Sequence, residues 1–461
     1  MEKDIDTVLS YIKEHKSYFE TGETKNIGFR IEQLKKMKKT IQENESLILA
    51  ALYEDLHKSE FEAYASEIGL LLDSIKHMIK NIKSWTSVKK VRTPITQLGG
   101  KSYIYSEPYG TVLIIGPFNY PFQLLMEPLI GAIAAGNCAV LKPSEYTPNV
   151  SKVISKIISE NFNEKYIRVV EGGVETTSSL IHAPFDYIFF TGSVPVGKLV
   201  MEAASKNLTP ITLELGGKSP CIIYSDADLK TAAKRIAWGK FLNAGQTCVA
   251  PDYVLVHKDV KNKFLDEMKY TLNNFYGEEP ILSKDYPRII NSRHLERLIE
   301  LLDESKIVVG GKYNKEELYM QPTIMDYVNW NDKIMEDEIF GPILPIIEYE
   351  DLDIVIKHIN SRPKLLALYI FTRNKSIESE IISRVPFGGG CVNDTISHLA
   401  TPYLPFGGVG ASGIGGYHGK HSFDTFSHKK SILKKTTKWS MNFIYPPYDK
   451  KKLSLLKKFL K

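Results

Sequence analysis

The chain has 461 residues, of which 43% are hydrophobic and 25% charged, with a net charge of +5; this is ordinary for a folded protein with a large core and favours two or three domains. Its four cysteines show no CxxC spacing and no HExxH occurs, so we expect neither a disulfide framework nor a metal site, and a reducing, cytoplasmic setting fits better. No apolar run suits a signal peptide or a membrane-spanning helix.

The first 90 residues are predicted to be helical. Periodic segments rich in Lys and Glu run over 31–56 and 61–85. After Gly99 and Gly100, side chains alternate over 102–106, which predicts a β-hairpin.

From residue 111 onward, short apolar runs alternate with helical stretches. The run 111–116 ends in glycine and suits a buried parallel strand, and a helix is predicted over 122–135. Further strands are predicted at 138–141, 166–170, 187–190, 220–224, 253–257, 345–349 and 367–371. This alternation predicts an α/β fold with mostly parallel sheets, in two doubly wound halves that meet near residue 210. The Gly- and aromatic-rich segment 401–426 fits neither half.

Three predicted strands end in loops with polar or glycine residues, at 116–121, 142–145 and 191–197. Ligands of doubly wound sheets bind at the carboxyl ends of strands. Glu145 is placed to accept hydrogen bonds from the adenosine ribose of a dinucleotide. Lys142 suits either a ribose hydroxyl of NAD or the 2′-phosphate of NADP, so the choice of cofactor stays open. Gly192 and Gly197, spaced as G-x4-G, are by themselves only a turn signal.

Cys248 follows a glycine-containing loop and is the candidate nucleophile. A nucleophilic thiol needs a base in reach or a lowered pKa, because a free thiol has a pKa of about 8.5. Glu214 stands between two leucines, and burial there raises the pKa of a carboxyl toward the range that suits a general base. Glu338 is the second candidate, although a solvated helix-end carboxylate is the plainer interpretation.

The other three cysteines are interpreted as structural. Cys138 and Cys221 lie inside apolar strands, where cysteine is usually a small core residue. Cys391 follows three glycines, and no base is expected near it.

Taken together, these motifs resemble the aldehyde dehydrogenase superfamily and, within it, the class 3 branch of fatty and aromatic aldehyde dehydrogenases. Over about 107–428 the matching segments occur in the family's order: GPFNYPF, IGAIAAGNCAVLKPSE, FTGSVPVGK, LTPITLELGGKSP, WGKFLNAGQTCVAPDY, DEIFGPILP and LPFGGVGASGIGGYHGKHSFDTFSH. Asp337 replaces the Glu often found at its position, which is a conservative departure. The resemblance implies two Rossmann-like domains, a small β bridging element that builds a homodimer, and NAD or NADP as cofactor.

The resemblance also implies the roles of the catalytic residues. Cys248 attacks the aldehyde, and the amide of Asn119 and the Cys248 N–H stabilise the oxyanion. The resulting thioester is hydrolysed by water that either Glu214 or Glu338 activates.

For the cofactor, the resemblance places Lys142 and Glu145 at the adenosine ribose. Gly192 and Ser193, with Gly197 in the same loop, lie beside the pyrophosphate. At the other end of the cofactor, Glu338 contacts the nicotinamide ribose and Phe340 lies near the nicotinamide.

The expected cofactor-binding domain comprises residues 1–90 and 107–210, and the catalytic domain comprises 211–395. A bridging element is expected at 91–106 and 396–430, and a tail at 431–461. Residues 429–461 carry eleven lysines and one acid, which gives this end +10 and the rest of the chain −5. Leu453, Leu456, Phe459 and Leu460 fall on one helical face. This face either packs on the body or a partner subunit or lies on an anionic membrane, and it is too short to span one.

Two other functions compete with hydrolytic oxidation. The thioester can pass to CoA or phosphate, or the protein can be a nucleotide-binding scaffold without chemistry. A Glu at position 214 favours water, and a scaffold needs neither Cys248 nor Asn119. We expect an apolar aldehyde, medium- or long-chain aliphatic or aromatic, with Tyr120, Phe122 and Tyr403 as candidate tunnel residues. No nucleic-acid partner is expected.

Overall fold

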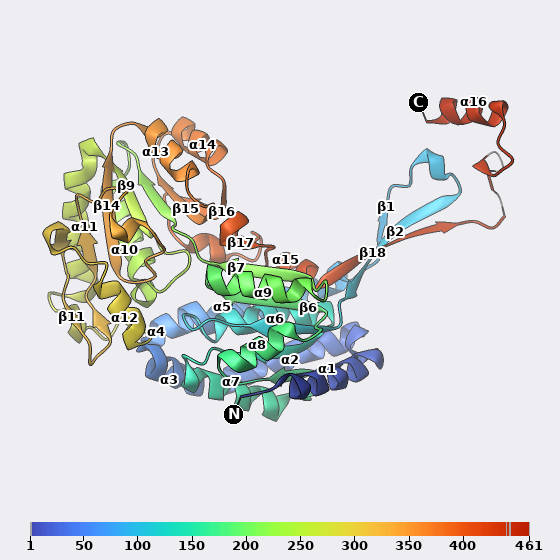
Figure 1. Ribbon diagram of the computed structural model, residues 1–461, viewed down its shortest axis with the longest axis horizontal. Helices are drawn as coiled ribbons and strands as arrows, with labels where there is room; N and C mark the ends of the chain where they lie inside the picture. Colours follow the sequence, from blue (N-terminus) through green and yellow to red (C-terminus); the bar gives the residue numbers. More distant parts are fainter. Residues whose placement is uncertain (1, 439, 442–443, 461) are drawn as a thin grey trace.

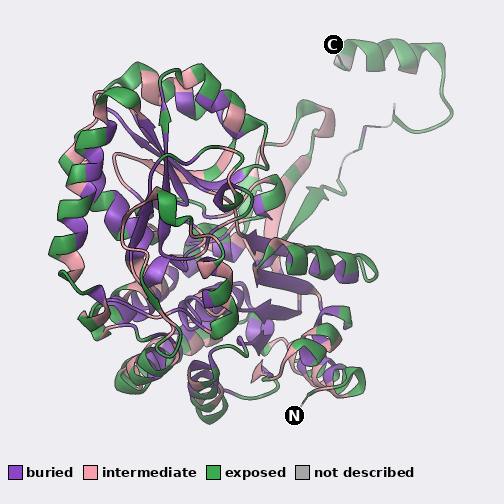
Figure 2. Cartoon of the chain, turned by 60° about the vertical axis from the view of Figure 1, so that its left-hand side comes forward, coloured by how far each residue is buried: buried purple, intermediate pink, exposed green. Residues whose placement is uncertain are grey.

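The computed structural model describes residues 2–438, 440–441 and 444–460, and two α/β units with a projecting three-stranded sheet make up the chain (Figure 1). Trp439, Phe443 and Lys461, which belong to the predicted tail, lie outside the described residues, as does the side chain of Phe459. The sheets of the two α/β units are buried, and the outer faces of the surrounding helices are exposed (Figure 2).

The first unit is built on a six-stranded sheet in the order β17-β7-β6-β3-β4-β5. Its strands are β3 (Thr111–Ile115), β4 (Cys138–Lys142), β5 (Ile167–Val169), β6 (Tyr187–Gly192), β7 (Ile211–Leu215) and β17 (Gly413–Ile414). The five longer strands are parallel, and the two-residue β17 pairs antiparallel with β7. Continuous apolar sequences such as 111–115 form strands here because helices cover both faces of the sheet.

Helices connect these strands and add an N-terminal layer. The connecting helices are α6 (Gln123–Ala135), α7 (Pro148–Asn161), α8 (Val174–His182) and α9 (Val194–Ser205). The N-terminal layer holds α1 (Ile5–Glu20), α2 (Ile27–Glu43), α3 (Glu45–Leu56), α4 (Glu60–Ala63) and α5 (Gly69–Trp85). The predicted helices are confirmed with two interruptions: a break at Asn44 and a five-residue π turn at Tyr64–Ile68.

The second unit is built on a seven-stranded sheet in the order β10-β13-β14-β9-β8-β15-β16. Its strands are β8 (Pro220–Ile223), β9 (Tyr253–His257), β10 (Ile307–Val309), β13 (Thr323–Met325), β14 (Ile343–Tyr349), β15 (Leu365–Phe371) and β16 (Phe387–Val392). Its helices are α10 (Leu229–Phe241), α11 (Lys261–Tyr276), α12 (Ser292–Ile299), α13 (Leu352–Asn360) and α14 (Lys375–Arg384). A separate hairpin joins β11 (Tyr313–Asn314) to β12 (Tyr319–Met320).

The remaining sheet joins β1 (Lys89–Val91), β2 (Gly100–Pro108) and β18 (Ser427–Lys435), all antiparallel. The hairpin predicted before residue 106 is therefore present. This sheet projects from the body, and the C-terminal helix α16 (Lys450–Phe459) stands beyond it, apart from both α/β units (Figure 1). A short helix, α15 (Lys420–Thr425), packs on α6 just before β18. None of the described helices combines the length and the apolar character that a membrane span requires.

Two expected boundaries differ from the sheet pairing. The predicted division near residue 210 falls before β7, yet β7 is hydrogen-bonded to β6 with Ile211 opposite Ile188, so the sheet changes only after Leu215. The bridging segment was expected to end at 430, but β18 pairs with β2 as far as Lys435. The expected boundary near 210 therefore falls one strand too early, and the boundary at 430 falls inside β18.

Candidate active site

Loops from the two α/β units meet beside Cys248. Asn119 follows β3 in the first unit, and its Nδ2 donates to the backbone oxygen of Gln246 at 3.0 Å. Asn243 Nδ2 in turn donates to the backbone oxygens of Asn119 at 2.7 Å and of Gln246 at 3.1 Å. These three hydrogen bonds join the predicted oxyanion residue to the segment that carries the predicted nucleophile.

A sharp turn positions the nucleophile loop. Asn243, Ala244 and Gly245 all adopt left-handed φ values, of 53°, 50° and 75°. A Cβ on Gly245 would lie 2.3 Å from the backbone oxygen of Gly341, so only glycine permits this approach of the two loops. The turn brings the Cys248 segment against the loop that carries Glu338.

The Cys248 thiol is protonated in this environment. Burial, and next the charges of Glu338 and Glu214, raise its pKa to about 12, although the backbone N–H groups of Cys248 and Val249 oppose the rise. The side chain is nonetheless partly exposed, so an aldehyde can reach the sulfur. Both predicted bases therefore lie close enough to Cys248 to influence its charge.

Glu214 extends from β7 into this region and is 4% exposed. Burial raises the pKa of its carboxyl well above the usual value. Neither carboxyl oxygen has a hydrogen-bond partner among the described residues. A buried, unpartnered carboxyl of this kind suits proton transfer to or from a water molecule.

Glu338 is held more firmly. Its carboxyl accepts a hydrogen bond from the Gly217 N–H, and a Cβ on Gly216 would lie 2.0 Å from its Oε2. Burial, and next the charge of Asp252, raise the pKa of Glu338 to about 8. Glu338 is partly exposed, and its side chain lies against the backbone of the 216–217 loop.

Side chains from other elements fix the Glu338 loop. Lys218 Nζ donates to the backbone oxygens of Ile334 at 2.7 Å and Asp337 at 2.9 Å, and pairs with Asp252 Oδ2 at 2.6 Å. Asp252 Oδ1 accepts from the Ile339 N–H at 3.0 Å. This framework was not anticipated from the sequence, since none of its residues stands out locally.

The predicted adenosine-ribose residues lie together at the carboxyl end of β4. Lys142 is 1% exposed, and its Nζ donates to the backbone oxygen of Pro143 at 2.8 Å and to Glu145 Oε2 at 3.1 Å. Glu145 itself is exposed. An ammonium and a carboxylate at one strand end can bind hydroxyl groups, and the ammonium also suits a phosphate.

The predicted pyrophosphate residues lie where β6 ends and α9 begins. Gly192 is the last residue of β6, and Ser193 is the N-cap of α9 without a side-chain capping bond. This helix start suits an anionic group. Gly197 lies in α9, where a Cβ would be 2.5 Å from Leu215, so glycine lets α9 approach β7.

Phe340 faces the Asn119 loop from the second unit. It has a left-handed φ of 48°, and its ring packs edge-on against Phe118 with centroids 5.8 Å apart. Of the three predicted tunnel aromatics, only Tyr120 lies at the site, with its hydroxyl 2.7 Å from Thr247 Oγ1. Phe122 is fully buried in the core, and Tyr403 is 78% exposed.

The remaining cysteines divide as expected, with one correction. Cys138 and Cys221 are fully buried within β4 and β8. Cys391 is partly exposed on β16, and His398 Nδ1 lies 3.5 Å from its sulfur, so the expectation of no nearby base was wrong. Burial lowers the pKa of His398 to about 4 and raises the pKa of Cys391, so this pair is neutral and the thiol is not activated.

The chain matches known proteins over nearly its whole length. The Aldehyde dehydrogenase family model matches residues 2–432. A 4,4'-diaponeurosporen-aldehyde dehydrogenase of Staphylococcus aureus is 55% identical over 97% of both chains. Aldehyde dehydrogenase family 3 member A2 of Mus musculus is 46% identical over 96% of this chain and 92% of its own length. An aldehyde dehydrogenase of Mus musculus described as dimeric and NADP-preferring is 45% identical over 92% and 94%.

Solved structures agree with the fold. A substrate-bound Staphylococcus aureus AldH has a TM-score of 0.97 at 54% identity, covering 98% of this chain and 99% of that one. An NAD+ complex of a Bacillus cereus aldehyde dehydrogenase has a TM-score of 0.85 at 25% identity, covering 94% and 90%. The predicted α/β fold and the predicted resemblance are both confirmed. The chain therefore belongs to the aldehyde dehydrogenase family, and it is an NAD(P)-dependent enzyme that oxidises aldehydes.

Proposed function

We propose that the enzyme oxidises an apolar aldehyde, medium- or long-chain aliphatic or aromatic, to its acid through a thioester on Cys248. The observation that carries this proposal is the junction of Cys248 with the Asn119 amide, the buried Glu214 and the partly exposed Glu338. The relatives named for 4,4'-diaponeurosporen-aldehyde and as family 3 member A2 support it.

The chemistry proceeds in two stages. The Cys248 thiol loses its proton to water, and the resulting thiolate attacks the carbonyl carbon. The Asn119 amide and the Cys248 N–H stabilise the oxyanion, each by about 3–4 kcal/mol in the transition state. A bound NAD(P) would supply the acceptor for the hydride that leaves this adduct. Glu214 then takes a proton from the water that hydrolyses the thioester, because its oxygens are unpartnered whereas Glu338 is held on Gly217.

The residues that would hold the cofactor lie at the strand ends of the first sheet and in the Glu338 loop. Lys142 and Glu145 bind the adenosine ribose, and Gly192 and Ser193 bind the pyrophosphate at the start of α9. Glu338 and Phe340 contact the nicotinamide ribose and ring. In this arrangement the six-stranded unit binds the cofactor and the seven-stranded unit supplies Cys248.

Following absorbance at 340 nm with a panel of aldehydes tests the reaction. We expect reduced cofactor and free acid in equal amounts with apolar aldehydes, and the same rate whether or not CoA or phosphate is added. A rate that requires CoA or phosphate would assign the thioester to a different acceptor. No reduction of either cofactor with any aldehyde would leave only a binding function.

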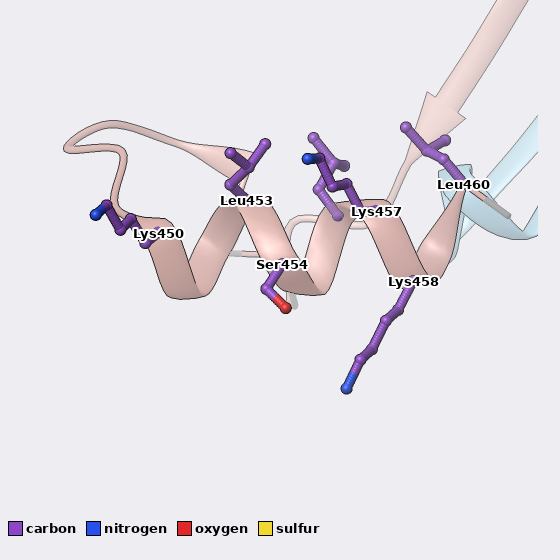
Figure 3. Close-up of a pocket in the computed structure, with 7 residues that line it drawn as sticks. Lys450, Leu453, Ser454, Lys457, Lys458 and Leu460 are labelled. Atoms are coloured by element: carbon purple, nitrogen blue, oxygen red, sulfur yellow. The ribbon is translucent and has the colours of Figure 1, made fainter.

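The projecting sheet of β1, β2 and β18 forms the contact of a homodimer in this proposal, in line with the relatives described as dimeric. The tail beyond it lies on an anionic membrane surface. Leu453 and Leu456 on α16 and Leu460 at its C-cap are 51%, 38% and 65% exposed, so they do not pack on the body. Figure 3 shows Leu453 and Leu460 on one side of the helix, with Lys458 directed away from them.

Vesicle co-sedimentation tests the tail. The full chain should sediment with phosphatidylcholine vesicles that contain phosphatidylglycerol and less with phosphatidylcholine alone, since each lysine near an anionic surface contributes about 1 kcal/mol. A Leu453→Ser/Leu456→Ser/Leu460→Ser variant keeps every lysine and should sediment less, because it loses the apolar contact. Equal sedimentation of the full chain and of a chain ending at residue 438 would contradict membrane contact through the tail.

A further inference from the structure

Beneath the Asn119 loop lies an ion pair that no proposed catalytic step uses. Lys58 Nζ and Glu67 Oε1 are 2.5 Å apart, and both side chains are completely buried. Both residues come from the N-terminal helical layer, far from the loop in sequence. A fully buried ion pair is costly to desolvate and weak evidence for stability, so its role calls for another explanation.

The pair fixes the backbone of the Asn119 loop at two places. Lys58 Nζ donates to the backbone oxygen of Asn119 at 2.8 Å. Glu67 Oε2 accepts from the N–H of Phe122 at 2.9 Å and, at 3.3 Å, from that of Gln123, where α6 begins. Together the two side chains satisfy polar groups at both ends of the 119–123 segment.

The same layer also reaches the nucleophile loop. Lys58 Nζ lies 4.1 Å below the centre of the Tyr120 ring, and the Tyr120 hydroxyl is 2.7 Å from Oγ1 of Thr247, the residue before Cys248. Glu62 Oε1 accepts from the Asn243 N–H at 2.9 Å. The N-terminal layer therefore holds both loops that form the proposed oxyanion site.

The π turn at Tyr64–Ile68 explains how Glu67 reaches this position. The turn interrupts the regular helix between α4 and α5, and Glu67 lies within it. Such turns are rare within α-helices and frequently occur at functional sites. Here the turn carries a carboxylate to the start of α6, where the helix dipole favours negative charge.

We propose that Lys58 and Glu67 are a positioning pair that aligns the Asn119 amide with the oxyanion formed on the aldehyde. The inference rests on the proposed thioester mechanism. With its carbonyl held by Lys58 and by Asn243, Asn119 presents its side-chain amide in one orientation without reorganisation during the reaction. The Lys58 ammonium also places a fixed positive charge behind the loop.

A first-turnover measurement tests the pair. In Lys58→Met the rate at which the first equivalent of reduced cofactor forms per subunit should fall about 10- to 100-fold. Small misplacements of catalytic groups have effects of this size. Lys58→Met/Glu67→Gln, which removes the Glu67 charge together with its Lys58 partner, should show the same loss. Alkylation of Cys248 by iodoacetamide should stay within about threefold of wild type, since this displacement builds no oxyanion.

Lys261→Met is the matched control. Lys261 is also a buried lysine in an ion pair, 3.4 Å from Asp326, and it lies in the second unit at the start of α11. Its loss should leave the first-turnover rate within about threefold of wild type. If Lys58→Met slows alkylation and the first turnover equally, the pair has only a folding role and the proposal is overturned.

A double-mutant cycle with Asn119→Ala tests whether Lys58 acts on the reaction through Asn119 or independently of it. Asn119→Ala should lower the first-turnover rate about 100- to 1,000-fold. In that background Lys58→Met should add less than about threefold, because the group it aligns is gone; a full multiplicative loss would overturn the proposal. Persistent turnover in Cys248→Ala would instead disprove the thioester mechanism, so the two failures are distinguishable.

Discussion

Replacing Cys248 with alanine is expected to lower the steady-state rate of aldehyde oxidation by at least about 10⁴-fold. Without the sulfur no covalent adduct forms, and the Asn119 amide has no oxyanion to stabilise. The proposed cofactor contacts at Lys142 and Ser193 lie on other elements, so cofactor binding should remain measurable by fluorescence titration. Loss of turnover with cofactor binding intact would separate the chemistry from folding.

Cys391→Ala is the matched control for this substitution. Cys391 is also a partly exposed thiol, and it is the one with an imidazole 3.5 Å away. Because burial keeps His398 neutral and the Cys391 thiol protonated, the variant should keep its activity within about threefold of wild type. Retained activity in Cys248→Ala, or loss of activity in Cys391→Ala, would show that Cys248 is not the nucleophile.

Several strands that the sequence patterns predicted correctly are buried along their whole length, among them β3, β4 and β8. The run at 111–115 is apolar throughout, and it forms the central strand β3 because both faces of the sheet are covered. β16 was not predicted, since Gly388, Gly389 and Gly390 read as a loop. A Cβ on Gly390 would lie 2.0 Å from the Leu368 backbone oxygen, so glycine is required here for the strands to approach.

Only some residues of the candidate site could be predicted from the sequence. Cys248, Asn119 and Glu214 stand in motifs whose order along the chain is itself informative. Lys58 and Glu67 were not predicted, because lysine and glutamate in a charged helical region read as solvent-exposed. Only the tertiary fold, which packs the N-terminal layer under the 119–123 segment, reveals that both are buried.

Glu214→Gln is expected to stop the reaction after one turnover. Reduced cofactor should appear in an initial burst of about one equivalent per subunit, followed by a steady-state rate about 100-fold or more below wild type, because a general base contributes about 10²–10⁴-fold. The acylation stage does not need the carboxylate, so the acyl-enzyme accumulates and can be detected as a mass increase on Cys248. Glu336→Gln, at an exposed carboxylate two residues before Glu338, is the control and should behave as wild type.

The pH dependence of hydrolysis gives an independent test of the base. Burial raises the pKa of Glu214 well above its usual value, so the carboxyl is protonated at low pH and can accept a proton only after it ionises. Wild-type thioester hydrolysis should therefore increase as pH rises, and this increase should disappear in Glu214→Gln. If Glu338→Gln accumulates the acyl-enzyme and Glu214→Gln turns over, Glu338 is the base instead. The increase should then centre near pH 8, where burial places the pKa of Glu338.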